Sequence, residues 1–317
     1  MQEATSGAGS QGAGSQGDVT SVRRRAAVLG HPIAHSLSPV LHRAAYRQLG
    51  LVGWHYEAID VSSSELADFM DSLGADSSLA PWAGLSLTMP LKETVIPLLD
   101  EIAPNAEQAR AVNTVVLEGG RRHGSNTDIT GLAGIVSDSS SRNGPPMTAT
   151  VIGAGATARS AISALGQAGV NDVMVSSRRP EAVEQLLVVA ARCGLRGSPG
   201  AWPPGEPEFS PKVVISTVPA SAFSGDGSSR GVEAVQLVES PNLLVDVIYD
   251  PWPTPIALAW QAAGGRVVGG LELLVRQAVE QVHLMTGLRP DIEGMRAAGE
   301  AALVSRAGAS DIAQAEQ

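Results

Sequence analysis

Cysteine is almost absent from this 317-residue chain, which contains only Cys193. A single thiol excludes both an intramolecular disulfide framework and a thiolate-rich metal cluster. Aromatic residues make up 3% of the sequence, so we expect a core built mainly from alanine, valine, leucine and isoleucine. The chain also lacks a dense basic block, and its formal net charge of -10 argues against a nucleic-acid partner, because phosphate binding needs clustered positive charge. No apolar run is long enough to span a bilayer, so we expect a cytoplasmic protein with no membrane partner.

The length and the 44% content of hydrophobic residues predict two domains, since one domain usually takes about 100 to 200 residues. Residues 1–23 repeat the letters GAGSQG and hold almost no large apolar side chain, which predicts a disordered tail. Beyond them, short apolar segments alternate with segments of helical spacing, and this rhythm predicts an α/β fold with a mostly parallel sheet. In the first half the predicted strands are 26–30, 54–61 and 84–88, the predicted helices are 38–50, 64–74 and 92–99, and a hairpin is predicted at 114–124.

The second half begins with a strand, a glycine turn and a helix in the sequence TATVIGAGATARSAISALGQAG. Gly153, Gly155 and Ala158 form the pattern G-x-G-x-x-A, a variant of the dinucleotide-binding fingerprint. The glycines allow a tight turn and a close approach of the backbone to a pyrophosphate, whose charge the N-terminus of the next helix meets. A glycine-rich turn without a ligand is the alternative interpretation. Further along, the Pro- and Gly-rich stretch 197–211 predicts a surface loop.

Two arginines, Arg178 and Arg179, follow the next predicted strand at 173–177. An acidic residue at this place would accept hydrogen bonds from the ribose 2′-hydroxyl of NAD, whereas an arginine accommodates a 2′-phosphate. A guanidinium can bind a phosphate through two parallel hydrogen bonds. We therefore expect NADP as the cofactor, with a solvated pair of arginines at a strand end as the alternative.

Residues 31–39 read HPIAHSLSP and place two histidines and two serines directly after the first predicted strand. Three interpretations compete for this stretch: a metal site, a serine nucleophile, or a loop that hydrogen-bonds a polar ligand. The metal site would need carboxylates or cysteines at a recognisable spacing, and the nucleophile would need a G-x-S-x-G turn. The sequence has neither here, so we expect a ligand-binding loop in which His31 and His35 are packing residues.

A nicotinamide cofactor in the second half would leave the first half to bind the molecule that is oxidised or reduced. Reduction of a ketone needs a hydride on carbon and a proton on oxygen, so a lysine or histidine near a carboxylate is expected. Lys92, Asn113 and Asp128 are the candidates. Lys92 follows Pro90, which can start a helix close to the carboxyl end of a strand, where ligands of α/β sheets usually bind. An ordinary surface lysine is the alternative.

Seven stretches of the chain occur in the order and spacing of the shikimate dehydrogenase family. They are HPIAHSLSP, GLSLTMPLK, AVNT, SNTDITG, VIGAGATAR, DVIYDPWPTP and GGLELLVRQA, and they cover about residues 25 to 305. The chain therefore resembles this family, which implies the reversible NADPH-dependent reduction of 3-dehydroshikimate to shikimate in chorismate and aromatic amino-acid biosynthesis. The resemblance also implies two α/β domains, a Rossmann-type NADP domain and a discontinuous N-terminal substrate domain.

The resemblance implies roles for individual residues. Lys92 and Asp128 are the implied catalytic pair, with the lysine giving or taking the proton at the reacting oxygen. The hydroxyls of Ser36 and Ser38 would bind the substrate carboxylate. The remaining implied substrate contacts come from Thr88, Asn113, Tyr249 and Gln277. The implied cofactor-binding residues are Gly153, Ala154, Gly155, Ala156, Thr157, Ser177, Arg178, Arg179, Val247 and Gly270.

The implied domain organisation has five segments. They are a disordered tail at 1–23, the first part of the substrate-binding catalytic domain at 24–128, the NADP-binding domain at 129–269, C-terminal helices returning to the substrate domain at 270–305, and a tail at 306–317. This fold class occurs as monomers and dimers, so we expect a monomer or a homodimer that binds a small-molecule substrate.

Five positions depart from the family pattern. Ser86 stands where asparagine is usual, Ser177 and Arg179 replace the first and last residues of an N-R-T cofactor motif, and Glu272 and Leu273 stand where glycine and methionine are common. These departures bear on the affinity and the preference for the cofactor more than on the type of reaction. Two other functions stay open: a quinate/shikimate dehydrogenase of broader specificity, against which Arg178 argues, and a non-catalytic NADP-binding regulator.

Overall fold

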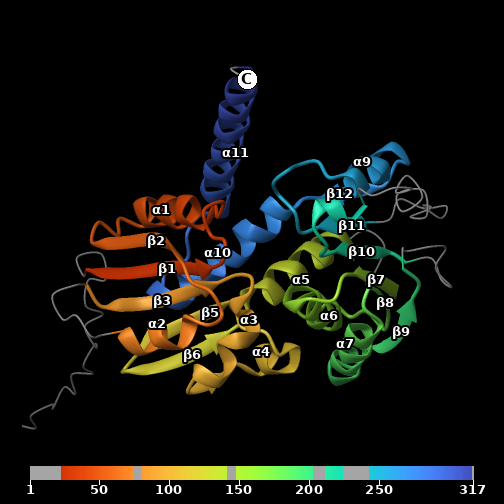
Figure 1. Cartoon of the computed structure of the whole chain (residues 1–317), viewed down its shortest axis with the longest axis horizontal. Helices are drawn as coiled ribbons and strands as arrows, with labels where there is room; N and C mark the ends of the chain where they lie inside the picture. Colours follow the sequence, from red (N-terminus) through yellow and green to blue (C-terminus); the bar gives the residue numbers. More distant parts are fainter. Residues whose placement is uncertain (1–22, 74–79, 141–147, 203–210, 224–242, 316–317) are drawn as a thin grey trace, which may run out of the picture.

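The computed structural model describes residues 23–73, 80–140, 148–202, 211–223 and 243–315. Within these residues the chain forms two lobes, each built on a six-stranded sheet (Figure 1). Apart from Arg23, the predicted N-terminal tail lies outside the described residues. None of the helices described is both long and apolar enough to cross a membrane.

The sheet of the first lobe has the strand order β2-β1-β3-β5-β6-β4. Its strands are β1 (Arg24–Gly30), β2 (Trp54–Asp60), β3 (Trp82–Leu87), β4 (Glu101–Ile102), β5 (Thr114–Glu118) and β6 (Arg121–Ser125). β1 pairs in parallel with β2 and β3, whereas β3, β5 and β6 pair antiparallel, so this sheet is mixed. The β5–β6 pair is the predicted hairpin, and its turn residues Gly119 and Gly120 have φ of 58° and 79°. Glycine adopts such positive angles without steric cost.

The sheet of the second lobe is parallel throughout, with the order β12-β11-β10-β7-β8-β9. Its strands are β7 (Thr148–Ile152), β8 (Asp172–Ser176), β9 (Arg196–Gly200), β10 (Val213–Ser216), β11 (Leu243–Asp246) and β12 (Arg266–Val268). The prediction of a loop from residue 197 was wrong for its first residues, because β9 pairs with β8 at the edge of the sheet. Pro199 is tolerated there because an edge strand leaves one row of backbone groups unpaired. Residues 203–210 of that predicted loop lie outside the described part of the chain.

The helices of the first lobe include α1 (Ser38–Gln48), α2 (Leu66–Ser72) and α4 (Pro104–Ala109). The continuous helix predicted at 92–99 was wrong. The chain instead forms a single turn, α3 (Leu91–Thr94), followed by the 3₁₀ turn η1 (Ile96–Leu98). Pro97 accounts for the break, since proline has no amide hydrogen to donate to an α-helical ladder.

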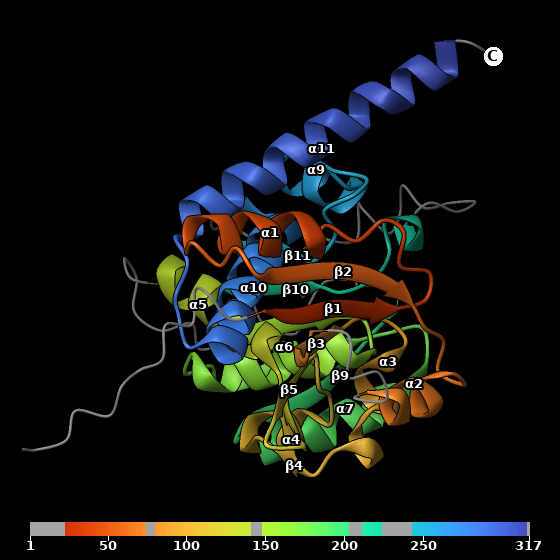
Figure 2. The ribbon, with the colours of Figure 1, turned by 90° about the vertical axis from the view of Figure 1, so that its left-hand side faces the viewer.

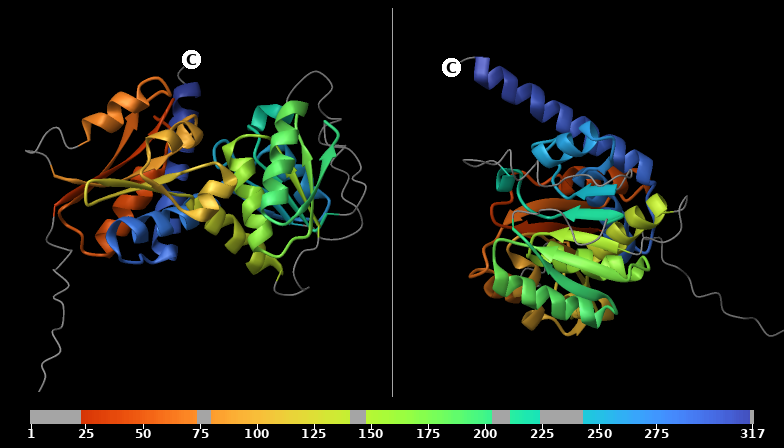
Figure 3. Two further views of the ribbon diagram at one scale, coloured as in Figure 1. Left: turned by 90° about the horizontal axis from the view of Figure 1, so that it is seen from below. Right: turned by 90° about the vertical axis from the view of Figure 1, so that its right-hand side faces the viewer.

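Two helices, α5 (Thr127–Ser140) and α10 (Gly270–Thr286), contact each other between the lobes (Figure 1). α10 also packs on β3 and β5 of the first sheet, whereas α5 packs on α6 (Ala156–Gln167) of the second lobe. The second lobe is completed by α7 (Pro180–Arg192), the 3₁₀ turn η2 (Ala220–Phe223) and α9 (Pro255–Ala262). Figure 3 shows the two lobes side by side from below.

The larger core cluster of the second lobe consists of alanine, valine, leucine and isoleucine around β7, β8, β10 and the neighbouring helices, and a smaller cluster adds Trp260. This confirms the expectation from the low aromatic content. In the first lobe, one apolar cluster lies between the sheet and α1 and α10, and it also takes in three aromatic residues, Tyr46, Trp54 and Tyr56. A second cluster covers the other face of that sheet.

The last helix, α11 (Ile292–Ala315), packs on α1 and α10 and then extends beyond both lobes (Figure 2). The sequence predicted a tail from residue 306. The helix continues through this predicted boundary, from Arg306 to Ala315. The segment is rich in alanine, the best helix former, which favours this continuation.

Candidate active site

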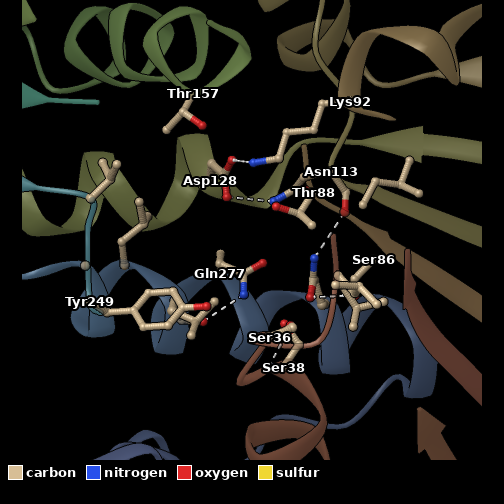
Figure 4. A pocket seen from close by; sticks show the side chains of 18 of the residues that line it. Ser36, Ser38, Ser86, Thr88, Lys92, Asn113, Asp128, Thr157, Tyr249 and Gln277 are labelled. Atoms are coloured by element: carbon tan, nitrogen blue, oxygen red, sulfur yellow. Dashed lines mark hydrogen bonds and ion pairs between the residues drawn. The ribbon is translucent and has the colours of Figure 1, made fainter. Parts of the chain in front are cut away.

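A cavity of about 250 Å³ opens between the lobes. Its walls come from the carboxyl ends of β1 and β3, the loop before α1, the start of α5 and one face of α10. All eight residues predicted to bind substrate or to catalyse the reaction line it, namely Ser36, Ser38, Thr88, Lys92, Asn113, Asp128, Tyr249 and Gln277 (Figure 4). The cavity thus lies where ligands of α/β sheets usually bind.

Lys92 and Asp128 form an ion pair in this cavity, with 2.6 Å between Lys92 Nζ and Asp128 Oδ2. The two side chains are only 13% and 7% exposed. The short α3 turn after Pro90 carries the lysine, and the first turn of α5 carries the aspartate. The alternative of a surface lysine is therefore wrong for Lys92.

Asp128 is held from two further directions. Asn113 Nδ2 donates a hydrogen bond to Asp128 Oδ1 over 2.8 Å, and the backbone N–H of Asp128 donates to Asn126 Oδ1 over 3.1 Å. Asn113 is itself fixed, because its Oδ1 accepts from the N–H of Thr127 at 2.8 Å and from the hydroxyl of Thr114 at 2.7 Å. The carboxylate is thus oriented by the protein before any ligand binds.

The two serines of the HPIAHSLSP stretch lie at the start of α1. The backbone N–H of Ser38 donates to Ser36 Oγ over 3.3 Å, and both residues face the cavity. The histidines do not pack inside the loop as predicted. His31 is exposed, and its Nδ1 lies 2.6 Å from a carboxylate oxygen of Asp60, which raises the pKa of the histidine. His35 is also exposed, at the rim of the cavity.

Tyr249 and Gln277 approach the cavity from the loop after β11 and from α10. The hydroxyl of Tyr249 donates to the carbonyl oxygen of His35 over 3.4 Å, and burial raises the pKa of Tyr249. Gln277 is buried, and its Nε2 donates to the carbonyl of Leu274 over 2.8 Å. Its Oε1 therefore stays turned toward the Thr127 hydroxyl, 3.5 Å away.

A buried polar network on one side of the cavity was not predicted from the sequence. Gln281 Oε1 accepts from Ser86 Oγ at 2.8 Å, and Ser86 Oγ accepts from the Tyr56 hydroxyl at 2.7 Å. Gln281 Nε2 donates to Thr114 Oγ1 over 3.1 Å, which links this network to the residue that holds Asn113. The signal for Gln281 was its spacing, because it lies four residues after Gln277 and so on the same helix face.

His42 completes this network and is fully buried. Its ring stacks on Tyr56 with 3.8 Å between centroids, and its Nε2 lies 3.2 Å from Gln281 Oε1. Burial lowers the pKa of His42 to about 3, so the ring is neutral at physiological pH. A neutral ring can donate one hydrogen bond to Gln281 without a buried charge.

The predicted dinucleotide fingerprint joins β7 to α6. Gly153 has φ of 119°, and a Cβ there would lie 2.2 Å from the Thr217 hydroxyl oxygen, so only glycine fits. Gly155 is the N-cap of α6, and a Cβ at that position would meet no atom within 4 Å. The space in front of the helix N-terminus is therefore open, which fits a pyrophosphate bound by the first-turn N–H groups.

Ser177, Arg178 and Arg179 follow the carboxyl end of β8, next to that turn in the sheet. The two arginines are exposed, and neither guanidinium has a side-chain partner among the residues that the structure describes. The Ser177 hydroxyl accepts from the backbone N–H of Arg179 over 3.3 Å. These residues line no part of the cavity, and they fit a phosphate at the far end of a dinucleotide.

Thr157, Val247 and Gly270 connect the fingerprint to the cavity, because all three line it. A Cβ at Gly270 would lie 2.1 Å from the carbonyl oxygen of Val247, so the close approach of these two backbones requires glycine. The carboxylate of Glu272 is turned away toward Arg276 and Arg296, at 2.6 Å and 2.9 Å. The departure at this position therefore adds an ion-pair cluster on α10 and α11.

Two family models match the chain. Residues 28–115 match the shikimate dehydrogenase substrate binding domain, and residues 270–298 match the shikimate 5′-dehydrogenase C-terminal domain. The first match spans the loop of Ser36, the strand before Lys92 and the turn of Asn113. The second spans all of α10 and the start of α11.

Related proteins resemble the chain over most of its length. A shikimate dehydrogenase (NADP(+)) of Thermus thermophilus is 35% identical over 280 residues, which cover 88% of this chain and 98% of the relative. The crystal structure of Mycobacterium tuberculosis shikimate dehydrogenase has a TM-score of 0.75 and 36% identity, with 88% of this chain and 99% of that one covered. A Thermus thermophilus shikimate 5-dehydrogenase, crystallised with NADP(H) and shikimate, has a TM-score of 0.72 and 34% identity over 88% and 99% of the two chains.

Proposed function

The chain belongs to the shikimate dehydrogenase family, and from this premise we propose how its own residues carry out the family reaction. It is an NADP-dependent oxidoreductase that interconverts 3-dehydroshikimate and shikimate, a step of chorismate and aromatic amino-acid biosynthesis. The mechanistic proposal rests on the Lys92–Asp128 ion pair. Lys92 Nζ lies 2.6 Å from Asp128 Oδ2, and the pair is buried in a cavity that both lobes line.

Lys92 is the proton-transfer group of this proposal. NADPH supplies the hydride that reaches the carbonyl carbon of the ketone. Lys92 Nζ donates a proton to the carbonyl oxygen during reduction and takes the proton back from the hydroxyl during oxidation. Asp128 holds the ammonium in place through Oδ2, and Asn113 holds Asp128 through Oδ1. Because these contacts hold the ammonium group in place before the substrate reacts, they lower the entropic cost of reaching the transition state.

The substrate carboxylate binds to the hydroxyls of Ser36 and Ser38, which face the cavity at the N-terminus of α1. The helix N-terminus adds a favourable dipole for an anion. Thr88, Asn113, Gln277 and Tyr249 present hydroxyl and amide groups to the hydroxyls of the substrate ring. Because these polar groups come from both lobes, they fix the ring so that one oxygen faces Lys92.

NADP binds across the fingerprint turn, with Gly153, Ala154, Gly155, Ala156 and Thr157 around the pyrophosphate. Ser177, Arg178 and Arg179 bind the 2′-phosphate, a role supported by guanidinium groups that have no side-chain partner in the described part of the chain. Val247 and Gly270 lie at the nicotinamide end, next to the cavity. In this arrangement the lobe of residues 24–128 and the helices of 270–305 bind substrate, and residues 129–269 bind the cofactor. A cytoplasmic monomer or homodimer suits this biosynthetic role, and sedimentation measures which of the two forms.

The experiment is a two-by-two assay in which purified protein receives shikimate or quinate with NADP⁺ or NAD⁺. Absorbance of the reduced nicotinamide is followed. The proposal expects turnover mainly with shikimate and NADP⁺. Strong activity with quinate or NAD⁺ would move the chain to the broader-specificity branch of the family. No turnover in any well, with NADP binding retained, would support the non-catalytic regulator instead.

A further inference from the structure

The C-terminal helix α11 lies antiparallel along α1, at a short distance. A Cβ at Gly294 would lie 2.0 Å from Nε2 of Gln48, near the end of α1. A Cβ at Gly299 would lie 3.1 Å from Cδ2 of Leu41, in the first half of α1. Moving toward the C-terminus of α11 therefore means moving toward the N-terminus of α1, where Ser36 and Ser38 lie.

Arg306 lies on α11 at that end of α1. It follows Gly299 by seven residues, which is about two helical turns, so it lies on the same face of α11. Its Nη1 donates to the carbonyl oxygen of His35 over 2.9 Å, and its Nη2 donates to the carbonyl oxygen of Ser36 over 3.4 Å. A guanidinium group from the last helix therefore binds the backbone of the loop that carries the substrate serines.

Arg306 also reaches the other lobe. Its Nη1 lies 3.9 Å from Asp250 Oδ2, in the loop after β11 that carries Tyr249. The carbonyl oxygen that Arg306 binds most closely, that of His35, also accepts from the Tyr249 hydroxyl. Three segments thus meet at one guanidinium. They are α11, the loop before α1 that carries Ser36, and the loop after β11 that carries Tyr249. The Arg306 side chain is two-thirds buried among them, with 33% exposed.

We propose that Arg306 is a positioning residue for the substrate carboxylate, acting through the two carbonyl groups of the Ser36 loop. The inference rests on the proposed function, since it assumes that the serine hydroxyls bind a carboxylate. Those hydroxyls are neutral donors, and the guanidinium supplies a positive charge behind them. It also fixes the loop, so the serines need no reordering when the anion binds. Preorganisation of this kind strengthens binding without new ligand contacts.

The test compares Arg306→Gln with Arg306→Lys and with a control, Arg192→Gln, which removes an exposed arginine from α7. We expect Arg306→Gln to raise the KM for shikimate about tenfold, the factor that the loss of one charge-assisted hydrogen bond typically produces. The kcat and the KM for NADP⁺ stay within about twofold, as expected for a residue that acts on substrate binding alone. Arg306→Lys restores part of the affinity, because it keeps the charge but loses the forked donor geometry.

An unchanged KM for shikimate in a folded Arg306→Gln protein would overturn the proposal. A fall in kcat with equal weakening of both substrates would overturn it as well, because that pattern indicates general loss of structure. Hydrogen exchange provides a second measurement that needs no activity. The N–H of Ser36, which donates to the Ile33 carbonyl over 2.9 Å, should exchange faster in Arg306→Gln than in the wild type. If the wild type shows no turnover with shikimate, the proposed function fails, and exchange at Ser36 alone then decides whether Arg306 holds the loop.

Discussion

Replacement of Lys92 by methionine is the sharpest perturbation of the site, because the chain offers a matched control. Lys92 and Lys212 are its only lysines, and Lys212 is exposed just before β10. Methionine keeps most of the length of lysine and removes the proton and the charge. We expect Lys92→Met to lower kcat by about 10²- to 10⁴-fold, the usual contribution of a general acid–base group. KM should change little, and Lys212→Met should behave as the wild type.

The structure also sets the cost in stability. Breaking a fully buried ion pair costs about 3–5 kcal/mol, because the remaining charge is stranded. Here Asp128 keeps the Asn113 hydrogen bond at Oδ1, and the cavity allows water to take the place of the ammonium at Oδ2. We therefore expect a loss of about 1.5–3 kcal/mol, comparable to one hydrogen bond to a charged group. A loss of this size leaves the protein folded, so the fall in kcat reports chemistry.

The assay is steady-state oxidation of shikimate by NADP⁺, with a urea unfolding curve for each variant. A kcat within tenfold of the wild type in Lys92→Met would refute the role of Lys92 in proton transfer. An equal fall in kcat in Lys212→Met would show that replacing a lysine lowers kcat through something other than the Lys92–Asp128 ion pair.

Three further predictions concern other parts of the chain. Arg178→Gln should weaken NADP⁺ binding about 10- to 100-fold and leave NAD⁺ binding nearly unchanged, since one charge-assisted contact to the 2′-phosphate is lost. Titration calorimetry measures both affinities, and equal weakening of the two cofactors would contradict the assignment of Arg178 to the 2′-phosphate. His42 has a pKa of about 3 in the folded protein, so below its unfolded value of 6.5 only the unfolded chain takes up the proton. As the pH is lowered between those two values, the free energy of unfolding should therefore fall by about 1.4 kcal/mol per pH unit, and urea curves for His42→Gln should lose this part of the slope. Glu93 and Arg159 form an ion pair between the lobes, with 3.1 Å between carboxylate and guanidinium, and Glu93 is half exposed. A double-mutant cycle with glutamine at both positions should give a coupling below about 1 kcal/mol, and a larger value would mean that the pair is shielded from water.

Residues that the sequence singled out line one cavity, whereas an edge strand of the second sheet was missed. Lys92, Asn113 and Asp128 could be proposed because acid–base chemistry restricts residue types and because strand ends converge in α/β sheets. The strand β9 was missed, since its sequence RGSPG contains none of the β-branched or aromatic residues that favour strands. Its pairing depends on the exposed edge of β8, which only the assembled sheet provides.

Contacts between distant segments were beyond the reach of sequence patterns. The Ser86–Gln281 hydrogen bond joins residues 195 positions apart, and the Arg306–His35 bond joins residues 271 positions apart. Neither pair has a local signature, because each depends on how α10 and α11 pack on the first lobe. Arg306 was assigned to a tail because the stretches that resemble the family end near residue 305. The helix from residue 292 contains no proline, but Gly294, Gly299 and Gly308 lie within it, and each glycine weakens the sequence signal for a helix.

In the proposed mechanism the substrate lies with its carboxylate at Ser36 and Ser38 and its reacting oxygen at Lys92. A crystal structure of the protein with bound shikimate measures this directly. We expect the carboxylate to contact the hydroxyls of Ser36 and Ser38, and the oxygen to be oxidised to lie within hydrogen-bond reach of Lys92 Nζ, about 2.6–3.2 Å. A shikimate molecule whose carboxylate points to Lys92, or whose hydroxyls all lie beyond the reach of Nζ, would contradict it.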